Sequence, residues 1–391
     1  MDKKEQLLTR GIEKIIDLDN FKEALNSKKK LRVKLGIDPT GDKIHIGRAT
    51  QLWKLRLFQE LGHKVVLIIG DFTALVGDPS DKPDGRSGLA KEEINKNMKS
   101  YLKQIDKVLD VKKAEIRYNT EWFSKMKLAD FLNLASNFSI QQLVQRRNFK
   151  ERWESQKPIS LKEITYPLLQ GYDSVAVKAD IELGGYDQLF NLNSGRDVQK
   201  IFNQKPQNIM ALKMLDGLDG RKMSTSWGNV VNITDEPNDM FGKLMSMNDD
   251  MIDSYFELCT QLSFEEIGKF KKEFSNPRNL KAVLAKEIIS LYHDREKAEK
   301  AEQEFEKVFK DKEIPTKIRE FFCPKDKYSI LEMLPHLDLA KSKGAAKRLV
   351  QQGGVKIENV VINDIHFEIT VKEGMIIQVG KRNFAKLTKK S

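Results

Sequence analysis

The sequence predicts an α/β fold in which a parallel sheet is followed by a helical segment and a small α+β unit. Apolar stretches at 31–37, 65–69, 114–118, 181–188 and 208–215 alternate with helical patterns. This alternation is typical of β-α-β units with right-handed crossovers. From 236 to about 312 only helical periodicity remains, and short strands return near the end. We therefore expect domains at 1–235, 236–320 and 328–391.

Composition favours a chain with sizeable cores and a polyanionic partner. Of the 391 residues, 40% are hydrophobic and 32% charged, and 68 Lys and Arg oppose 57 Asp and Glu. The net charge of +11 suggests a polyanionic partner, although a lysine-rich proteome would also produce it. Cys259 and Cys323 are isolated, which predicts reduced thiols and no zinc site. With no signal peptide or membrane-spanning run recognised, we expect a cytoplasmic protein without a membrane partner.

The first strand-to-helix junction carries the strongest local signal. Residues 5–27 predict one or two amphipathic helices, and the strand 31–37 then leads through the turn-rich loop 38–42 into a helix. His45-Ile46-Gly47 falls at the N-terminal end of that helix, where unpaired N–H groups favour phosphate. The alternative is an ordinary junction with a surface histidine.

Two loops follow the second strand. Residues 70–80 leave its carboxyl end, where open α/β sheets bind ligands. Residues 81–88 contain no apolar side chain and carry Lys82 and Arg86. This polar segment is either a linker or a lid.

A polar stripe is predicted on the helix that starts near Tyr166. Ser160 to Glu163 has the form of a capping box, and Pro167 either kinks that helix or starts a new one. Tyr166, Gln170 and Asp173 recur at i, i+4 and i+7 without the Lys and Glu of solvated faces. The stripe indicates a polar pocket wall, or alternatively a buried structural hydrogen-bond network.

The remaining signals are weaker individually. The strand 181–188 ends in Gly184-Gly185, which permits close backbone approach. The loop 216–226 combines two basic residues with three hydroxyls, and such a loop is usually a solvated turn. Near the end, the basic helix 341–349 and three short strands favour an RNA-binding module, with a dimerisation or capping domain as the alternative.

Together these segments resemble the bacterial tyrosyl-tRNA synthetases over nearly the whole chain. His45-Ile46-Gly47-Arg48 is similar to the first class I signature, and Lys222-Met223-Ser224-Thr225-Ser226 to the second. The stretches 166–173 and 184–188 carry the likeness to the tyrosine enzymes, and 329–387 resembles a small RNA-binding domain shared with a ribosomal protein. The resemblance implies a Rossmann-like catalytic domain, a helical anticodon-binding domain and a C-terminal RNA-binding domain.

The family resemblance also implies a reaction and its residues. Tyrosine would attack the α-phosphate of ATP, giving tyrosyl-adenylate and pyrophosphate, and the acyl group would pass to the terminal adenosine of the tRNA for tyrosine. ATP would enter as a substrate carrying Mg²⁺, with no protein metal site, and the chain would form a homodimer through the region near 110–160. The implied pyrophosphate-binding, catalytic residues are Thr40, His45, Lys82, Arg86 and Lys222.

The implied binding residues fall into three sets. ATP would contact Asp38, Gly47, Arg48, Asp187, Met214, Leu215, Lys222, Ser224 and Thr225. Tyrosine would contact Gly36, Asp78, Tyr166, Gln170, Asp173 and Gln188, with Asp173 accepting a hydrogen bond from the phenol hydroxyl. The tRNA would contact Lys341, Lys343, Lys347, Arg348, Lys381 and Arg382.

Four positions depart from the family pattern. Arg48 replaces the usual second histidine of the first signature, and Thr225 replaces the second lysine of the second signature. We hypothesise that these two changes offset each other around the same phosphates. Tyr186 stands where a small residue is usual. Lys34 stands where some members have a second phenol-binding tyrosine, which places more weight on Asp173.

Two other functions are compatible with these motifs. A tryptophan-type relative shares the class I core, although the Asp173 stripe and the C-terminal module argue against it. A catalytically weak homologue retained as an RNA-binding protein, such as a splicing factor, is allowed by Thr225 but disfavoured by His45 and Lys222.

Overall fold

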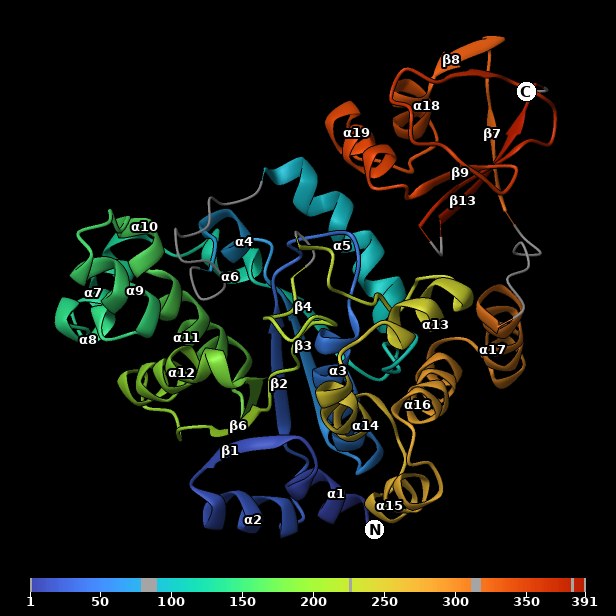
Figure 1. Cartoon of the computed structure of the whole chain (residues 1–391). Helices are drawn as coiled ribbons and strands as arrows, with labels where there is room; N and C mark the ends of the chain where they lie inside the picture. Colours follow the sequence, from blue (N-terminus) through green and yellow to red (C-terminus); the bar gives the residue numbers. More distant parts are fainter. Residues whose placement is uncertain (1, 79–89, 225–226, 311–317, 381–382, 390–391) are drawn as a thin grey trace. The chain divides into compact units, whose positions relative to one another are not determined.

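A computed structural model describes residues 2–78, 90–224, 227–310, 318–380 and 383–389 (Figure 1). The chain forms two compact units. One contains Met1–Glu236 and Lys243–Arg295, and the other contains Pro237–Gly242 and Glu296–Ser391. Most of the helical segment after 236 therefore packs with the sheet. The assignment of 236–320 to anticodon binding is not addressed by this grouping and stays a prediction.

The first unit is built on a six-stranded sheet in the order β1-β6-β5-β2-β3-β4. Strands β2 to β6 pair in parallel, as the alternating pattern predicts, and β1 pairs antiparallel with β6. The carboxyl ends of the parallel strands therefore meet at one edge of the sheet. The strands are β1 (Ile12–Ile16), β2 (Arg32–Ile37), β3 (Lys64–Ile69), β4 (Glu115–Tyr118), β5 (Ile181–Gly185) and β6 (Asn208–Leu212).

The prediction of helices throughout 5–27 is wrong in its middle. The segment forms α1 (Lys3–Thr9), β1 and α2 (Leu18–Asn26). Gly11 has a φ of 65°, which ends the helical path, and the isoleucines of β1 suit an edge strand beside β6. Helical spacing over so short an apolar stretch cannot exclude a strand.

Helices cover both faces of this sheet (Figure 1). Helices α11 and α12 pack against each other and on β2, β5 and β6. Helix α3 packs on β2 and β3 and also contacts the later helix α14. The capping box at Ser160 is confirmed, and Pro167 occupies the first turn of α11, so it starts a new helix. The helices before α13 are α3 (Ile46–Glu60), α4 (Thr73–Val76), α5 (Lys91–Ile105), α6 (Thr120–Phe123), α7 (Leu128–Ala135), α8 (Ile140–Val144), α9 (Arg147–Glu154), α10 (Leu161–Ile164), α11 (Tyr166–Val177) and α12 (Leu189–Ile201), with the 3-10 turn η2 (Tyr186–Gln188).

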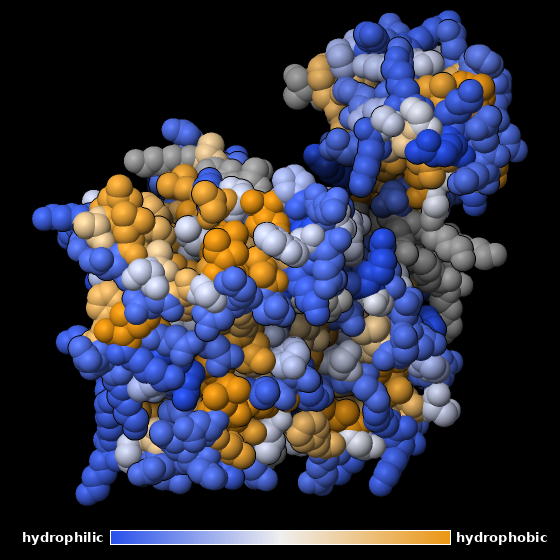
Figure 2. Space-filling model, turned by 90° about the vertical axis from the view of Figure 1, so that its left-hand side faces the viewer, coloured by the Kyte–Doolittle hydropathy of each residue, from blue (hydrophilic) through white to orange (hydrophobic). Residues whose placement is uncertain are grey.

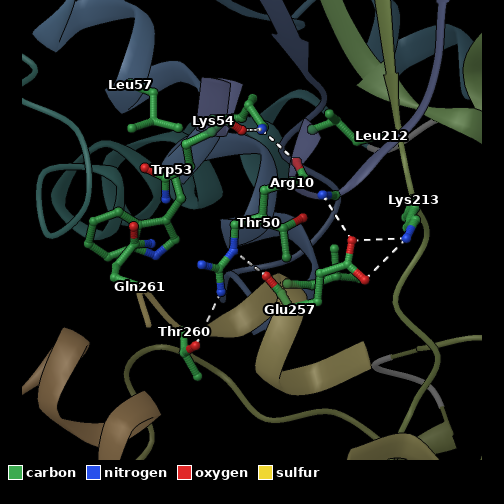
Figure 3. Close-up of a pocket in the computed structure, with 13 residues that line it drawn as sticks. Arg10, Thr50, Trp53, Lys54, Leu57, Leu212, Lys213, Glu257, Thr260 and Gln261 are labelled. Atoms are coloured by element: carbon green, nitrogen blue, oxygen red, sulfur yellow. Dashed lines mark hydrogen bonds and ion pairs between the residues drawn. The ribbon is translucent and has the colours of Figure 1, made fainter. Parts of the chain in front are cut away.

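Two buried cations, Arg10 and Lys54, link the end of α1 to α14 (Ile252–Cys259) and to α3 (Figure 3). Arg10 donates to the carbonyls of Phe256 and Glu257 at 2.9 and 2.6 Å, where α14 ends. Lys54 of α3 donates to the carbonyls of Gln6, Leu7 and Arg10, where α1 ends. These side chains satisfy orphan carbonyls at two helix ends. The adjacent cavity of about 40 Å³ has room for water and not for a substrate.

Further helices follow in the chain, namely α13 (Pro237–Met245), α15 (Phe264–Glu273), α16 (Pro277–Tyr292) and α17 (Arg295–Lys310), with the 3-10 turn η4 (Asp249–Met251).

In the second unit, β7 (Arg319–Phe322), β9 (Val355–Ile357), β10 (Val360–Val361), β12 (Ile376–Val379) and β13 (Asn383–Thr388) form a sheet in the order β10-β9-β12-β13-β7. A two-stranded ribbon joins β8 (Lys327–Ser329) and β11 (Glu368–Thr370), and the helices are α18 (Ile330–His336) and α19 (Lys343–Gln351). The predicted basic helix is present, two residues later than expected. The buried core of the second unit includes Ile330, Leu334, Val350 and Ile377.

Candidate active site

The segments near residues 45 and 222 meet in the structure, although about 175 positions of chain separate them. Ile46 N–H donates to the carbonyl of Val231 at 2.9 Å, and His45 forms a bridge with Asn232. A Cβ on Gly47 would lie 2.9 Å from the sulfur of Met223. The glycine therefore permits direct contact between the first helical turn of α3 and the loop 216–224.

His45 is the N-cap of α3. Its Nδ1 accepts a hydrogen bond from Arg48 N–H at 3.3 Å, which orients the ring at the helix start. The first turn of α3 gathers N–H groups and the positive end of the helix dipole, an arrangement that attracts anions.

Arg48 braces the loop that follows β2. Its guanidinium donates to Thr40 Oγ1 at 3.2 Å, to the carbonyl of Asp38 at 3.4 Å, and to the hydroxyl of Tyr101 at 2.6 Å. Tyr101 belongs to α5 and is almost fully buried. Arg48 thus fixes Thr40 beside the N-terminus of α3, a contact that sequence spacing did not reveal.

Asp38 accepts hydrogen bonds from two segments that are distant in the sequence. Thr73 Oγ1 donates to its Oδ1 at 2.7 Å, and the Tyr166 hydroxyl donates to its Oδ2 at 2.8 Å. Burial raises the pKa of Asp38 to about 6, against the opposing effect of these hydrogen bonds. A Cβ on Gly70 would overlap Asp38, so the glycine at the end of β3 makes space for this carboxylate.

The loop 216–224 is organised by Asn229. Its side chain accepts from Ser224 N–H at 2.8 Å and donates to Asp219 and to the carbonyl of Lys222. Hydrogen bonds from Asn229 and Arg221 lower the pKa of Asp219 to about 2. The Lys222 ammonium lies 3.5 Å from Asp187 Oδ2, so the loop reaches the end of β5.

The sheet is uncovered at Gly36, and we refer to this exposed part of β2 as the Gly36 slot. This residue lies in β2 between β3 and β5, yet it is exposed, and a Cβ there would meet nothing within 4 Å. Tyr166 and Asp173 of α11 lie at 7% and 4% exposure. Met214, just after β6, is 45% exposed, whereas Leu215 is buried.

Asp173 is a buried carboxylate with two donors. Trp122 Nε1 donates to Oδ1 at 2.9 Å, and Asn119 Nδ2 donates to Oδ2 at 3.4 Å. Burial raises the pKa of Asp173 to about 7, although Lys34 and these donors act in the opposite direction. Asn119 and Trp122 were missed from sequence because no local pattern links them to a helix some fifty residues later.

The other predicted tyrosine-binding residues form a connected network. Asp78 pairs with Arg146 at 2.7 Å and accepts from Gln188 at 2.9 Å. Gln170 donates to Glu182 at 3.2 Å and accepts from Asn191 at 3.0 Å. The side chains of the polar stripe are all hydrogen-bonded, as a structural network requires, and a pocket wall at this stripe stays a prediction. Arg146 and Asn191 are further residues that sequence reasoning missed.

Several predicted residues lie elsewhere or outside the description. Lys341, Lys347 and Arg348 are exposed on or beside α19, and Lys343 pairs with Glu332 at 2.9 Å. Lys82, Arg86, Thr225, Lys381 and Arg382 fall outside the described residues.

The described ranges contain neither a candidate metal cluster nor a candidate membrane-spanning helix. In those ranges, three or more His, Cys, Asp and Glu side chains nowhere gather into a cluster that could hold a metal ion. Nor does any helix there combine the length and the hydropathy needed to cross a membrane.

Residues 26–310 match the family model described as tRNA synthetases class I (W and Y). A tyrosine–tRNA ligase of Carboxydothermus hydrogenoformans is 44% identical, over 98% of this chain and 97% of its own. One from Thermotoga maritima is 43% identical, over 98% of this chain and 96% of its own. The chain belongs to the tyrosyl-tRNA synthetase family.

Solved structures of this family share the fold. The tyrosyl-tRNA synthetase of Archaeoglobus fulgidus, crystallised with L-tyrosine, aligns with a TM-score of 0.64 over 77% of this chain and 100% of its own, at 24% identity. A mitochondrial tyrosyl-tRNA synthetase of Aspergillus nidulans, truncated at its C-terminus, also gives 0.64, over 78% and 93%, at 20% identity.

Proposed function

We propose that this chain is a tyrosine–tRNA ligase, which activates tyrosine with ATP and transfers it to the terminal adenosine of its tRNA. One observation carries the proposal. The two signature segments meet at the N-terminus of α3, on the same unit as a buried carboxylate, Asp173, whose helix α11 packs on β2, the strand that carries Gly36.

Activation needs positioning and charge stabilisation, with no covalent enzyme intermediate. The carboxylate of tyrosine attacks the α-phosphorus of ATP, and the bond to the bridging oxygen of pyrophosphate breaks. Negative charge then grows on the departing pyrophosphate. Thr40, His45 and Lys222 supply donors there, assisted by Lys82 and Arg86, and Mg²⁺ arrives with the triphosphate as part of the substrate.

The nucleotide would lie along the carboxyl edge of the sheet. Asp38 and Gly47 approach it from the β2 side, and Arg48 acts by holding Thr40 and the Asp38 carbonyl in place. Asp187 takes the ribose hydroxyls in exchange for its contact with Lys222. The backbone at Met214 and Leu215 holds adenine, and Ser224 and Thr225 complete the loop around the phosphates.

Tyrosine would enter the slot with its phenol toward Asp173. An ionised carboxylate that already accepts from Trp122 and Asn119 has lone pairs left for a third donor. Phenylalanine offers no such donor and would leave a buried carboxylate short of a partner, which is costly. Asp78, Tyr166, Gln170 and Gln188 would surround the amino acid's ammonium and carboxylate over Gly36.

The tRNA would bind through the basic residues of the second unit and through the helices of 236–320. Lys341, Lys343, Lys347 and Arg348 lie on or near α19, and Lys381 and Arg382 follow β12 in the sequence. The net charge of +11 supports a polyanionic partner.

We also propose a homodimer through α7 to α10. Large apolar side chains there are unusually exposed, namely Leu128, Leu132, Ile140, Trp153 and Leu161, at 53–76%. Hydrophobic patches are visible on the face of the molecule seen in Figure 2. Exposed apolar clusters of this kind mark association surfaces.

The test is ATP–pyrophosphate exchange with single amino acids. Exchange with tyrosine, and none with tryptophan, supports the proposal. Exchange with tryptophan alone would select the tryptophan-type relative. No exchange with either, together with tight RNA binding, would select the RNA-binding homologue.

A further inference from the structure

A fully buried ion pair joins β2 to β5. Lys34 of β2 and Glu182 of β5 have side chains 0% and 1% exposed, with Nζ 2.9 Å from Oε1. The ammonium has three protons and three acceptors, because it also donates to Ser174 Oγ at 2.8 Å and to the carbonyl of Gln170 at 3.0 Å. Lys34 is therefore fully engaged.

The carboxylate is equally well partnered. Glu182 accepts from Gln170 Nε2 at 3.2 Å, from Ser174 Oγ at 3.0 Å, and from Gln207 Nε2. Gly195 of α12 covers this cluster, since a Cβ there would lie 2.5–3.0 Å from Gln207, Glu182 and Ser174. The whole group is thus enclosed between β2, β5, α11 and α12.

Stability alone gives little reason for this arrangement. Well-packed apolar side chains of similar volume usually stabilise a core as well as a buried ion pair does. The position of the pair suggests another role. Lys34 shares a strand face with Gly36, and its two partners on α11, Gln170 and Ser174, lie on either side of Asp173 along the helix.

We propose that Lys34 and Glu182 are positioning residues for tyrosine recognition, which hold the Gln170–Ser174 turn of α11 and set the electrostatic environment in which Asp173 accepts a hydrogen bond from the phenol hydroxyl. This inference rests on the proposed tyrosine-activating function. Neither residue touches the reacting atoms in this assignment, so both act through Asp173 and Gln170.

The charges around Asp173 give the two residues opposite effects. Lys34 faces it from β2 and Glu182 from β5, and Tyr166 lies on its own helix. From α6, the neutral Trp122 indole donates to it, and Arg117, which stacks on that indole, is paired with Glu121. A cation favours the ionised carboxylate and an anion disfavours it. Removing Lys34 should therefore leave Asp173 protonated up to a higher pH, and removing Glu182 should keep it ionised to a lower pH.

The experiment compares Lys34→Met and Glu182→Gln with the wild type by tyrosine-dependent ATP–pyrophosphate exchange from pH 5.5 to 9, with active sites titrated. We expect KM for tyrosine to rise about tenfold in Lys34→Met, with KM for ATP within about twofold. The pH midpoint of tyrosine KM should move up by about half a unit or more in Lys34→Met and down in Glu182→Gln. Lys54→Met is the matched control, because Lys54 is also buried and also has three acceptors, all of them backbone carbonyls, at a site away from Asp173.

A merely structural role makes a different prediction. Midpoints that stay at the wild-type value, or that move in the same direction in both variants, would overturn the proposal, as would an equal shift in Lys54→Met. If Lys34→Met does not fold, Glu182→Gln decides alone, since an unchanged or raised midpoint contradicts the proposal. Wild type without tyrosine-dependent exchange would refute the proposed function itself, a result distinct from these.

Discussion

Individual carboxylates in this protein have very different proton affinities because their surroundings differ. Burial raises the pKa of Asp38 to about 6 and that of Asp173 to about 7, whereas donors on an exposed loop lower the pKa of Asp219 to about 2. Helical spacing alone was enough to select Asp173 from the sequence. It could not select Asn119 or Trp122, whose contacts with Asp173 depend on how β4 and α11 pack.

The first prediction concerns the pH dependence of tyrosine binding. Asp173 accepts a hydrogen bond from the phenol hydroxyl best as a carboxylate, and its pKa is raised from 3.8 to about 7. KM for tyrosine should therefore rise several-fold as pH falls from 8 to 6, with KM for ATP changing much less. Exchange kinetics over this range check it, and a flat tyrosine KM would contradict the assigned role of Asp173.

The same shift has a consequence for stability. Because the folded state holds the Asp173 proton more tightly than the unfolded chain, this group binds more protons in the folded protein between pH 4 and 7. Its contribution to the free energy of unfolding is thus fully present below about pH 4 and is lost as pH rises through about 7. Tyrosine bound at pH 8 offsets this loss, because its phenol hydroxyl donates a hydrogen bond to the ionised carboxylate.

At the scale of elements, the close approach of α11 and α12 encloses the polar cluster. Glycines make this approach possible, since a Cβ on Gly171 would lie 2.7 Å from Val198 and one on Gly195 would crowd Gln207 and Glu182. The sequence predicted the helices and parallel strands because long periodic segments determine them. It mispredicted β1, where a five-residue isoleucine-rich stretch took its conformation from pairing with β6.

The second prediction compares two helical glycines. Gly195→Ala should lower the free energy of unfolding by about 1–3 kcal/mol through overpacking and should raise KM for tyrosine. Gly268→Ala in α15 is the control, because a Cβ there meets nothing within 4 Å, and it should stabilise by up to about 1 kcal/mol. Urea unfolding followed by circular dichroism measures both. Equal effects of the two substitutions would show that the α11–α12 packing is not tight.

At the scale of the molecule, the chain forms two compact units, and the contact between segments near 45 and 222 is made within the first. Motif order in the sequence anticipated this contact, because both segments follow strands of one parallel sheet. The detailed environment of the slot could not be anticipated. The Lys34–Glu182 pair joins two strands whose adjacency depends on the sheet order β5-β2.

The third prediction concerns self-association through α7 to α10. We expect the wild type to sediment as a dimer of the 45.0 kDa chain, and Leu132→Glu combined with Trp153→Glu to sediment as a monomer. Leu18→Glu is the control, since Leu18 is an isolated exposed leucine on α2. Sedimentation velocity distinguishes these states, and a dimeric double variant would place the interface elsewhere.

The selectivity of ATP–pyrophosphate exchange for tyrosine over phenylalanine tests the account most directly, because the two substrates differ only in the hydroxyl that Asp173 is assigned to read. We predict that kcat/KM for tyrosine exceeds that for phenylalanine by more than about a thousandfold in the wild type, a difference of about 4 kcal/mol or more. Asp173→Ala should reduce this ratio by at least about tenfold. Comparable exchange with both amino acids in the wild type, or a ratio unchanged by Asp173→Ala, would contradict the account.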